Sequence, residues 1–384
     1  MRQSENLFEK AREVMSAHWR SGSKPTWGYT APNPERYEWQ WLWDSCFHAI
    51  IWAELGEADR GLLELATLLE AMEPSGFLPH MNYVADPAAA KEFWGREGTS
   101  SITQPPMFGH AIAELVRRGV DVPEELAQKS AEALRFFLRY RETSGLVVLC
   151  HPWESGADDS LRWDSFYAVP YGHPRWQDEK IKLMETIARD SNGTPLTNPR
   201  FPVASAWFTA VVAFNIAELA NATGAIDKSE ATGLVEAVES SWDDVLHTWV
   251  DRVDTVTTKT QQTSSPPIRK SDSGDSKQAP VLEALLGVLA DRNEERLAIV
   301  CEDLFNPSKY GAPYGPAGVS QSHKSYEGHS YWRGATWPQL TYLLCHALRA
   351  RDRPTEAQTL ATQLRSGAIT SKACLLYTSP SPRD

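Results

Sequence analysis

The segment 151–164, HPWESGADDSLRWD, concentrates side chains that could carry acid–base chemistry. Its carboxyl groups, on Glu154, Asp158, Asp159 and Asp164, stand beside two tryptophans and one histidine. A solvated acidic loop, a metal site or half of a hydrolytic pair could all have this composition. Burial and carboxylate neighbours raise the pKa of a carboxyl group and keep it protonated as a general acid. Because the chain has no HExxH or HxH spacing, we expect no metal here.

Three further segments mix aromatic, acidic and amide residues. They are 37–49 (YEWQWLWDSCFHA), 76–83 (GFLPHMNY) with 101–107 (SITQPPM), and 326–344 (YEGHSYWRGATWPQLTYLL). The chain also has 15 Trp in 384 residues. An indole offers a flat apolar face and one N–H donor, which suits a sugar ring but equally suits a core. The number of tryptophans alone leaves both interpretations open.

Four motifs, in order along nearly the whole chain, resemble one enzyme family. They are W-x-W-D-S-x-F-H-A (41–49), S-I-T-Q-P-P (101–106), W-E-S-G-x-D-D-S (153–160) and Y-W-R-G-x-x-W-P (331–338). The chain resembles the mannosylglycerate/glucosylglycerate hydrolase group, which is related to the processing α-glucosidases of glycoside hydrolase family 63 and more distantly to trehalases. The resemblance implies an all-α fold, an (α/α)6 barrel or six-hairpin toroid, and an inverting glycosidase.

An inverting glycosidase needs two carboxyl groups roughly 6.5–9.5 Å apart, one that protonates the leaving oxygen and one that activates water. By resemblance, Asp158 is the general acid, and Glu154 and Asp159 support it. The alternative for Asp158 is a loop residue that caps the following turn. Resemblance and side-chain chemistry together suggest ten substrate-binding residues: Trp43, Asp44, His80, Tyr83, Gln104, Trp153, Trp332, Arg333, Gly334 and Trp337.

Some of these residues have structural alternatives. Asp44 could cap a helix over 45–55, because Asp is a favoured N-cap residue. Pro105 and Pro106 could fix the loop of Gln104 or simply open a helix. A lone histidine such as His80 is more often structural, and either Trp153 or Trp163 could belong to the core.

Helical periodicity dominates the chain. Leu62, Leu65, Leu68, Leu69 and Met72 share one face of the segment 59–72. We expect about a dozen helices, over about 4–19, 44–55, 59–72, 105–118, 123–140, 177–190, 202–221, 226–248, 279–290, 293–304, 336–350 and 354–366. The best strand candidate is LVVLC at 146–150. One domain over 1–373 with a polar surface insertion at about 251–280 fits this pattern better than two domains and a linker.

The end of the chain departs from the rest. CLLYTSPSPRD, at 374–384, fits no helical or strand period and resembles a translated sequencing adapter, so we expect a non-native tail. In the family that the chain resembles, the general base is a Glu downstream of the Y-W-R-G motif. In this chain, the corresponding position falls where the tail begins. We therefore expect a barrel incomplete at its C-terminus and an inactive or nearly inactive chain. Glu327 lies near the motif, but nothing assigns it the role of base.

Composition excludes several kinds of partner. The net charge of −12 argues against nucleic acid and anionic membranes. No apolar run is long enough for a membrane span, and the first residues lack a signal-peptide pattern. Five Cys without CxxC spacing indicate reduced thiols, so we expect a cytoplasmic protein. We expect a small carbohydrate substrate and no cofactor, and a homo-oligomer stays open.

The substrate and the function class have alternatives. A glycerate carboxylate would need a cationic or hydroxyl partner, and Arg200, Arg162 and Tyr83 are candidates. A neutral α-glucoside would indicate an α-glucosidase of the oligosaccharide-processing or trehalase-like type. A non-catalytic sugar-binding protein is a further alternative. A metal-dependent hydrolase would use His48, His80, His110 and His151, and a helical scaffold would leave the Trp/Asp/Gln loops without a purpose.

Overall fold

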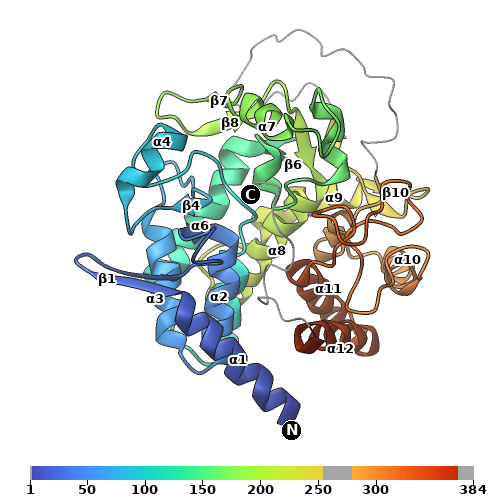
Figure 1. The fold of residues 1–384 in the computed structure, drawn as a ribbon, viewed down its shortest axis with the longest axis horizontal. Coiled ribbons are helices and arrows are strands. Elements are labelled where there is room, and N and C mark those ends of the chain that lie inside the picture. The colour runs from blue at the N-terminus through green and yellow to red at the C-terminus, as the bar shows by residue number, and fades with distance from the viewer. Residues whose placement is uncertain (1, 254–278, 371–384) are drawn as a thin grey trace. The chain divides into compact units, whose positions relative to one another are not determined.

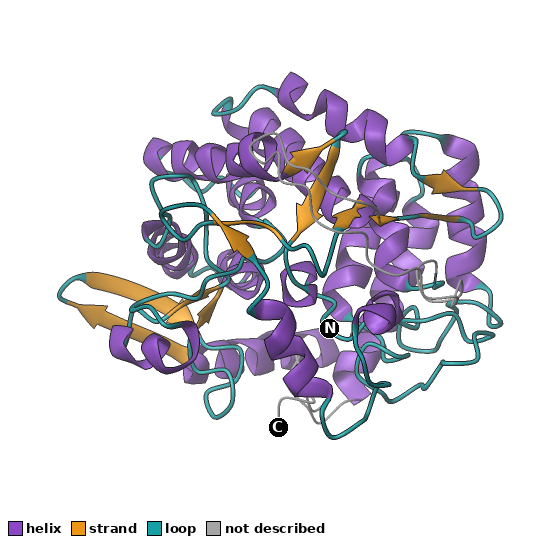
Figure 2. Ribbon diagram, turned by 90° about the horizontal axis from the view of Figure 1, so that it is seen from above, coloured by secondary structure: helices purple, strands orange, loops and turns teal. Residues whose placement is uncertain are grey.

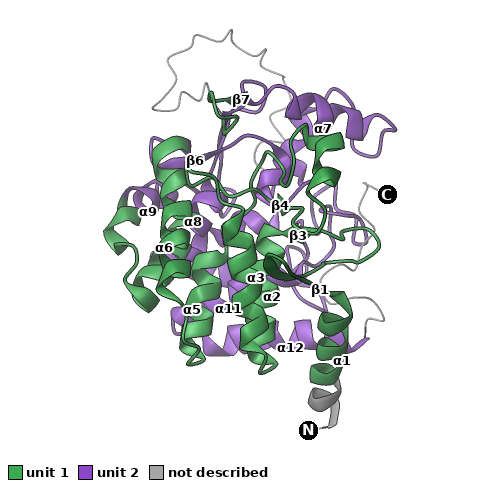
Figure 3. Ribbon diagram, turned by 90° about the vertical axis from the view of Figure 1, so that its left-hand side faces the viewer, with its two compact units in different colours: residues 1–140, 189–195, 212–232 green, residues 141–188, 196–211, 233–384 purple. Residues whose placement is uncertain are grey.

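The computed structural model describes residues 2–253 and 279–370. These residues divide into two compact units, shown in Figure 3. Unit 1 comprises residues 1–140, 189–195 and 212–232, and unit 2 comprises 141–188, 196–211 and 233–384. The expected insertion and the expected tail fall largely on residues 254–278 and 371–384, outside the described residues. One domain over 1–373 stays a prediction.

Unit 1 is built mainly from helices, with short strands between them (Figure 1). Its elements are α1 (Arg2–His18), β1 (Trp19–Ser23), β2 (Thr26–Thr30), β3 (Gln40–Trp41), α2 (Leu42–Glu54), α3 (Ala58–Glu70), β4 (Met81–Asn82), η1 (Pro87–Ala89), α4 (Ala90–Trp94), α5 (Phe108–Arg117), α6 (Glu124–Phe136) and η5 (Lys228–Ala231).

The pair α2 and α3 forms the centre of unit 1 (Figure 1). Helix α2 is buried along most of its length, because its residues 42–52 are largely apolar. A Cβ on Gly61 of α3 would lie 2.7 Å from the carbonyl oxygen of Ala49 in α2, so glycine is needed for this close approach. Strand β3 leads directly into α2 and pairs with β4, with Trp41 opposite Met81. Two of the segments singled out in the sequence, 37–49 and 76–83, therefore meet in this unit.

Unit 2 combines one small sheet with helices. Its elements are β5 (Glu142–Thr143), β6 (Leu146–Leu149), η3 (Pro152–Ser155), η4 (Leu161–Phe166), α7 (Trp176–Met184), β9 (Val203–Ser205), β10 (Trp242–Asp243), β11 (Thr248–Trp249), β12 (Arg252–Val253), η6 (Leu282–Leu289), α10 (Glu294–Phe305), α11 (Pro338–Ala350) and α12 (Pro354–Thr370). The remaining elements include residues of both units: η2 (Phe137–Arg141), β7 (Ala188–Arg189), β8 (Pro195–Thr197), α8 (Ala206–Thr223) and α9 (Thr232–Glu239).

The sheet of unit 2 positions the acidic segment. It has the order β12–β9–β6–β5 with antiparallel pairs, and Leu149 of β6 stands opposite Val203 of β9. All four residues of β6 are buried, as expected for a continuous apolar run. The acidic segment starts two residues after β6 ends, so its first residues are fixed by a buried strand.

The prediction of a mainly helical protein is confirmed at this coarse level, as Figure 2 shows. The helix expected over 226–248 ends at Glu239, and β10 and β11 follow. There the aromatic and β-branched residues Trp242, Thr248 and Trp249 favour strands. The segment 279–290 forms a 3-10 helix, and the helix over 177–190 already ends at Met184. Within the described residues, no helix is both long and apolar enough to cross a membrane.

Two further sequence interpretations were wrong. The segment 19–30 forms an antiparallel hairpin of β1 and β2, which the sequence analysis missed because its side chains alternate only weakly between exposed and buried. Asp44 is no N-cap residue, because α2 already begins at Leu42 and its N-cap is Trp41. Pro105 and Pro106 precede α5, whose N-cap is Met107.

Candidate active site

The acidic segment of unit 2 starts as a tightly bonded turn. His151 accepts a hydrogen bond from the Trp153 backbone N–H through Nδ1 at 3.1 Å, and its Nε2 lies 3.0 Å from the Lys180 carbonyl oxygen. The Ser155 hydroxyl donates to the Pro152 carbonyl and accepts from the Ala157 N–H at 3.0 Å. These bonds fix the backbone immediately before Asp158.

Glu154 and Asp159 are fully buried, and each pairs with a positively charged side chain. Glu154 forms two hydrogen bonds with the Arg141 guanidinium, at 2.8 and 3.1 Å, and accepts the Cys150 N–H at 2.6 Å. Asp159 pairs with Lys180 and accepts the Trp176 indole N–H at 2.9 Å. Buried charges persist when they are paired and hydrogen-bonded. Both carboxylates therefore support the loop.

Asp158 differs from both, since it is partly exposed. Its Oδ2 accepts a hydrogen bond from the Tyr331 hydroxyl at 3.4 Å. The surroundings are acidic: burial, together with the charges of Asp159, Asp158 and Asp164, raises the pKa of Tyr167 well above its ordinary value. A carboxyl group that solvent can reach, next to other carboxylates, is compatible with the predicted role of proton donor. A raised pKa of Asp158 itself stays a prediction.

Arg333 of the Y-W-R-G motif is buried and lies against the acidic segment. Its two terminal nitrogens donate to both oxygens of Asp164, at 2.8 and 2.7 Å. Its guanidinium carbon lies 3.9 Å from the ring centroid of Tyr171. Bidentate arginine–carboxylate pairs are among the strongest charge-assisted hydrogen bonds. Arg333 therefore joins the last motif to the end of the acidic segment.

Trp332 and Trp337 form a stacked pair in the same unit. Their ring centroids are 4.0 Å apart with an interplanar angle of 12°, and Tyr331 meets Trp337 edge-on at 5.3 Å. Neither indole nitrogen has a hydrogen-bond partner among the described residues, although both are buried. Buried polar groups normally have partners. The two N–H groups are therefore suited to donate to a bound ligand.

Gly334 and Trp153 have contacts within the protein. A Cβ on Gly334 would lie 2.6 Å from the Glu327 carbonyl oxygen, so glycine is needed for the path of its own loop. The sequence analysis placed Gly334 among the substrate-binding residues, and that role stays a prediction. Trp153 is buried, with its ring centroid 4.7 Å from that of His151.

In unit 1, Trp43, Asp44 and Gln104 lie close to the start of α2. All three are buried, and the Trp43 backbone N–H donates to Gln104 Oε1 at 3.4 Å. Asp44 lies in the first turn of α2, where the helix dipole favours a negative charge. The structure thus brings the first and second motifs together.

His80 and Tyr83, also in unit 1, belong to an aromatic cluster. The His80 ring contacts Trp41 and Trp94 edge-on, with centroids at 5.3 and 5.2 Å, and its Nδ1 lies 2.6 Å from the Ser100 hydroxyl. The Tyr83 hydroxyl accepts the Trp94 indole N–H at 2.9 Å. These contacts give both residues a role in packing.

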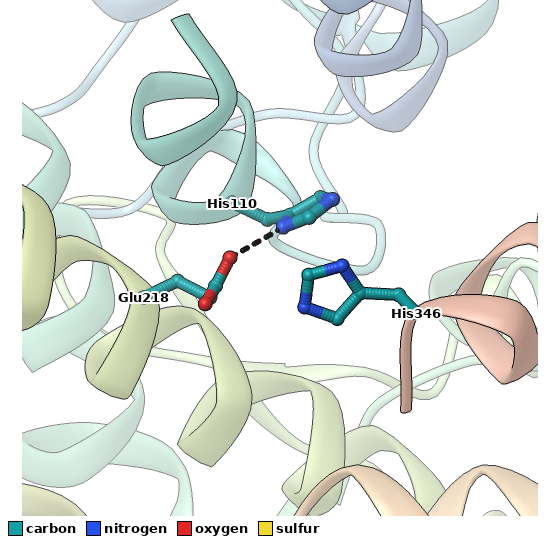
Figure 4. A group of neighbouring side chains, drawn as sticks. All are labelled: His110, Glu218 and His346. Carbon is teal, nitrogen blue, oxygen red and sulfur yellow. Dashed lines mark hydrogen bonds and ion pairs between the residues drawn. The ribbon is translucent and has the colours of Figure 1, made fainter. Parts of the chain in front are cut away.

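The other histidines considered as metal ligands each have a protein partner. His48 Nδ1 lies 3.1 Å from Glu64, and His110 Nδ1 lies 2.8 Å from Glu218 (Figure 4). His151 bonds to the backbone of its own unit, as described above. These pairings account for the burial of the imidazole rings.

The candidates for binding a substrate carboxylate have unequal surroundings. Arg162 is buried and pairs with Asp251 at 2.5 Å and Glu283 at 3.3 Å, so two carboxylates of the protein already neutralise it. Arg200 is exposed. The Tyr83 hydroxyl already accepts from Trp94. The geometry therefore disfavours Arg162.

Several residues at the site had no assigned role in the sequence analysis. Tyr331 opens the Y-W-R-G-x-x-W-P motif, so its position in the motif was the available signal. Asp164 ends the acidic segment and appeared only as a charged neighbour of Asp158. Tyr171 and Trp176 lie in a segment without a motif, and no pattern of residue types could have found them.

A helical protein with a partly exposed carboxyl group and stacked tryptophans has the features of a glycoside hydrolase. The chain belongs to the family described as "Mannosylglycerate hydrolase MGH1-like glycoside hydrolase domain", which matches residues 37–373. The resemblance found in the motifs is thereby confirmed, and the chain is a member of a glycosidase family.

Three known proteins show the extent of the similarity. The mannosylglycerate hydrolase of Rubrobacter radiotolerans is 26% identical over 93% of this chain and 88% of its own length. The glucosylglycerate hydrolase of Mycolicibacterium hassiacum is 28% identical over 83% of this chain and 82% of its own. A crystal structure of the GH63 mannosylglycerate hydrolase from Thermus thermophilus, in complex with Tris and D-glycerate, matches with a TM-score of 0.74 at 22% identity. That match covers 93% of this chain and 90% of that chain, and it shows the same fold.

Proposed function

We propose that this protein is an inverting glycoside hydrolase that cleaves the α-glycosidic bond of a small glycosylglycerate, such as glucosylglycerate or mannosylglycerate. The observation that carries the proposal is the setting of Asp158, which is partly exposed between two buried carboxylates that each pair with a cation. The names of the two relatives support the substrate class. The fold we propose is an (α/α)6 barrel.

In the proposed mechanism, Asp158 donates its proton to the oxygen of the leaving glycerate. The neighbouring carboxylates hold the proton on Asp158 until the glycosidic bond breaks, because a second negative charge close by is unfavourable. A second carboxylate must activate the attacking water on the opposite face of the sugar. We assign this base to none of the described residues, and the exposed Glu327 has no contact that suggests the role.

The aromatic and amide residues are proposed to bind the sugar. Trp332 and Trp337 would offer their indole N–H groups to hydroxyls, and Trp43 would offer its face to the C–H side of a ring. Asp44 and Gln104 would accept from or donate to sugar hydroxyls. The two buried indole N–H groups in unit 2 are the most direct support for this part of the proposal.

The test measures binding and hydrolysis separately. Isothermal titration calorimetry with glucosylglycerate, mannosylglycerate and trehalose gives affinities, and released sugar gives turnover. In a protein that carries the general base, Asp158→Asn should keep the affinity and reduce kcat by about 10²–10⁴-fold. Asp178→Asn, an exposed aspartate on α7 of the same unit, is the matched control and should change neither.

Each alternative has its own result in this test. Preference for trehalose over both glycosylglycerates would indicate an α-glucosidase of the processing or trehalase-like type. Binding of a glycosylglycerate without turnover, in a protein that carries the general base, would indicate a sugar-binding protein. Turnover that survives Asp158→Asn would contradict the role of Asp158.

A further inference from the structure

We propose that Arg333 is a positioning residue that acts through Asp164 and Tyr171 to hold the Tyr331 hydroxyl against Asp158. It would thereby fix the orientation of the Asp158 carboxyl group without touching the substrate. The proposal rests on the proposed function only in calling Asp158 the general acid, and its geometric part stands alone. It deepens the site with a role that differs from the substrate contact expected for Arg333 from the sequence.

The first support is the engagement of the guanidinium group. Both terminal nitrogens of Arg333 donate to Asp164, and its guanidinium carbon lies 3.9 Å from the centroid of the Tyr171 ring. The buried Nε of Arg333 has no hydrogen-bond partner among the described residues. The side chain is only 3% exposed, whereas that of Asp164 is 33% exposed. An arginine with its terminal donors and one face in use within the protein is better suited to hold two segments together than to bind a ligand.

The second support is a further anchor on the other side of Tyr331. The Tyr171 hydroxyl lies 3.3 Å from the Ser330 hydroxyl and 3.4 Å from the Tyr331 carbonyl oxygen. Tyr171 therefore contacts residues 330 and 331 with its hydroxyl and Arg333 with its ring. The residue between the two anchors, Tyr331, reaches Asp158 across 173 positions of sequence.

The third support is the backbone between the anchors. Trp332 has φ of 55°, a left-handed conformation that is unfavourable for a bulky residue. Such a conformation persists when the surroundings determine it, and it is frequent at functional sites. The Glu327 N–H donates to the Arg333 carbonyl at 3.0 Å, which closes the loop on itself. The anchors and this bond together hold Tyr331 in its place.

The expected consequence concerns the Asp158 proton. A hydroxyl that donates to a carboxylate stabilises the ionised form, so Tyr331 lowers the pKa of Asp158 relative to the same site without it. The other charged and titratable groups around Asp158 are Asp159, Asp164, Tyr167 and Arg333. The aspartates raise the pKa of Tyr167 and Arg333 lowers it. Loss of either anchor should let Tyr331 move away and raise the pKa of Asp158.

The experiment follows the Asp158 carboxyl directly by ¹³C NMR of protein labelled at the aspartate carboxyl carbon. Asp158→Asn identifies the resonance, and a pH titration gives its midpoint. Tyr331→Phe should raise the midpoint by roughly 0.5 unit, as expected for the loss of one weak hydrogen bond. Arg333→Lys and Tyr171→Phe should raise it in the same direction, and neither changes the net charge.

Two measurements distinguish a positioning role of Arg333 from a general loss of structure in its variants. The shifts from Arg333→Lys and Tyr331→Phe should not add in the double variant, because both remove the same contact. Arg135→Lys removes a bidentate pair of similar geometry with Glu230, at 2.9 and 2.8 Å, and should leave the midpoint unchanged. Tyr171→Phe keeps the ion pair, so it remains informative if Arg333→Lys fails to fold.

The outcomes are distinct from those of the proposed function. A midpoint unchanged in both Arg333→Lys and Tyr171→Phe, or shifts that add fully to that of Tyr331→Phe, would overturn the positioning role. The NMR titration needs neither substrate nor turnover. The NMR titration can therefore be interpreted even if the protein does not hydrolyse glycosylglycerates. Conversely, a catalytic role of Asp158 would not by itself show that Arg333 positions Tyr331.

Discussion

The acidic segment of unit 2 and the aromatic cluster of unit 1 are both dense in polar side chains, but different forces hold them. The acidic segment depends on buried ion pairs, Arg141–Glu154 and Lys180–Asp159, and on the partly exposed pair Arg333–Asp164. The aromatic cluster depends on ring contacts and on hydrogen bonds between uncharged groups, such as that of the Trp94 indole with the Tyr83 hydroxyl. Ion pairs can thus fix a segment rich in carboxylates, whereas ring contacts and hydrogen bonds are enough to fix a cluster of aromatic residues.

The largest effect on stability should come from breaking a buried ion pair in the acidic segment. Arg141→Met leaves Glu154 buried without its cation and should lower the free energy of unfolding by about 3–5 kcal/mol, measured by urea denaturation. Arg141→Met combined with Glu154→Leu should recover much of this loss, because the unpaired charge is removed as well. If the double variant is no more stable than the single one, charge is not what holds this segment.

A smaller effect should follow from Gly334→Ala in the Y-W-R-G motif. The added methyl group would meet the Glu327 carbonyl oxygen, so the loop must shift, at a cost of about 1–3 kcal/mol by analogy with overpacking. Thermal denaturation measures this cost. Gly233→Ala is the matched control, since nothing lies within 4 Å of a Cβ there. Equal losses in both variants would contradict the steric explanation.

A still smaller effect is expected in the aromatic cluster. Ser100→Ala removes the partner of His80 and of the Met81 N–H and should lower the free energy of unfolding by about 1 kcal/mol. The same urea experiment as for Arg141→Met allows direct comparison. A loss from Ser100→Ala larger than that from Arg141→Met would break the contrast between the two regions.

The smallest effect concerns pH. Burial raises the pKa of Glu283 in unit 2, against the opposing influence of Arg162. A carboxyl group with a raised pKa in the folded state stabilises the protein below its unfolded pKa and loses this contribution as pH rises through the folded pKa. Glu283→Gln should therefore flatten the fall of stability with pH just above the ordinary range of a glutamate. Urea denaturation midpoints, measured across this pH range for the unchanged protein and for Glu283→Gln, give the two slopes of stability against pH.

The sequence predicted the family and most of the helices, because order of motifs and period of apolar residues are local properties. It could not predict which charged groups pair. Arg333 and Asp164 are 169 positions apart, and neither residue type indicates the other as its partner. The strands at 242–249 were missed for a related reason, since the helical pattern before Glu239 was extended past its end. The position of Asp44 could not be predicted either, because an aspartate is favourable both at the N-cap and in the first turn of a helix.

The stacked pair of Trp332 and Trp337 has an optical consequence. Two indoles held nearly parallel at 4.0 Å share their excited states, so their transitions split and give a paired positive and negative band in circular dichroism. The contribution of this pair depends on the relative orientation of its two rings. It should vanish when either tryptophan is replaced by phenylalanine, and its change on addition of sugar would report the geometry of this loop in solution without any label.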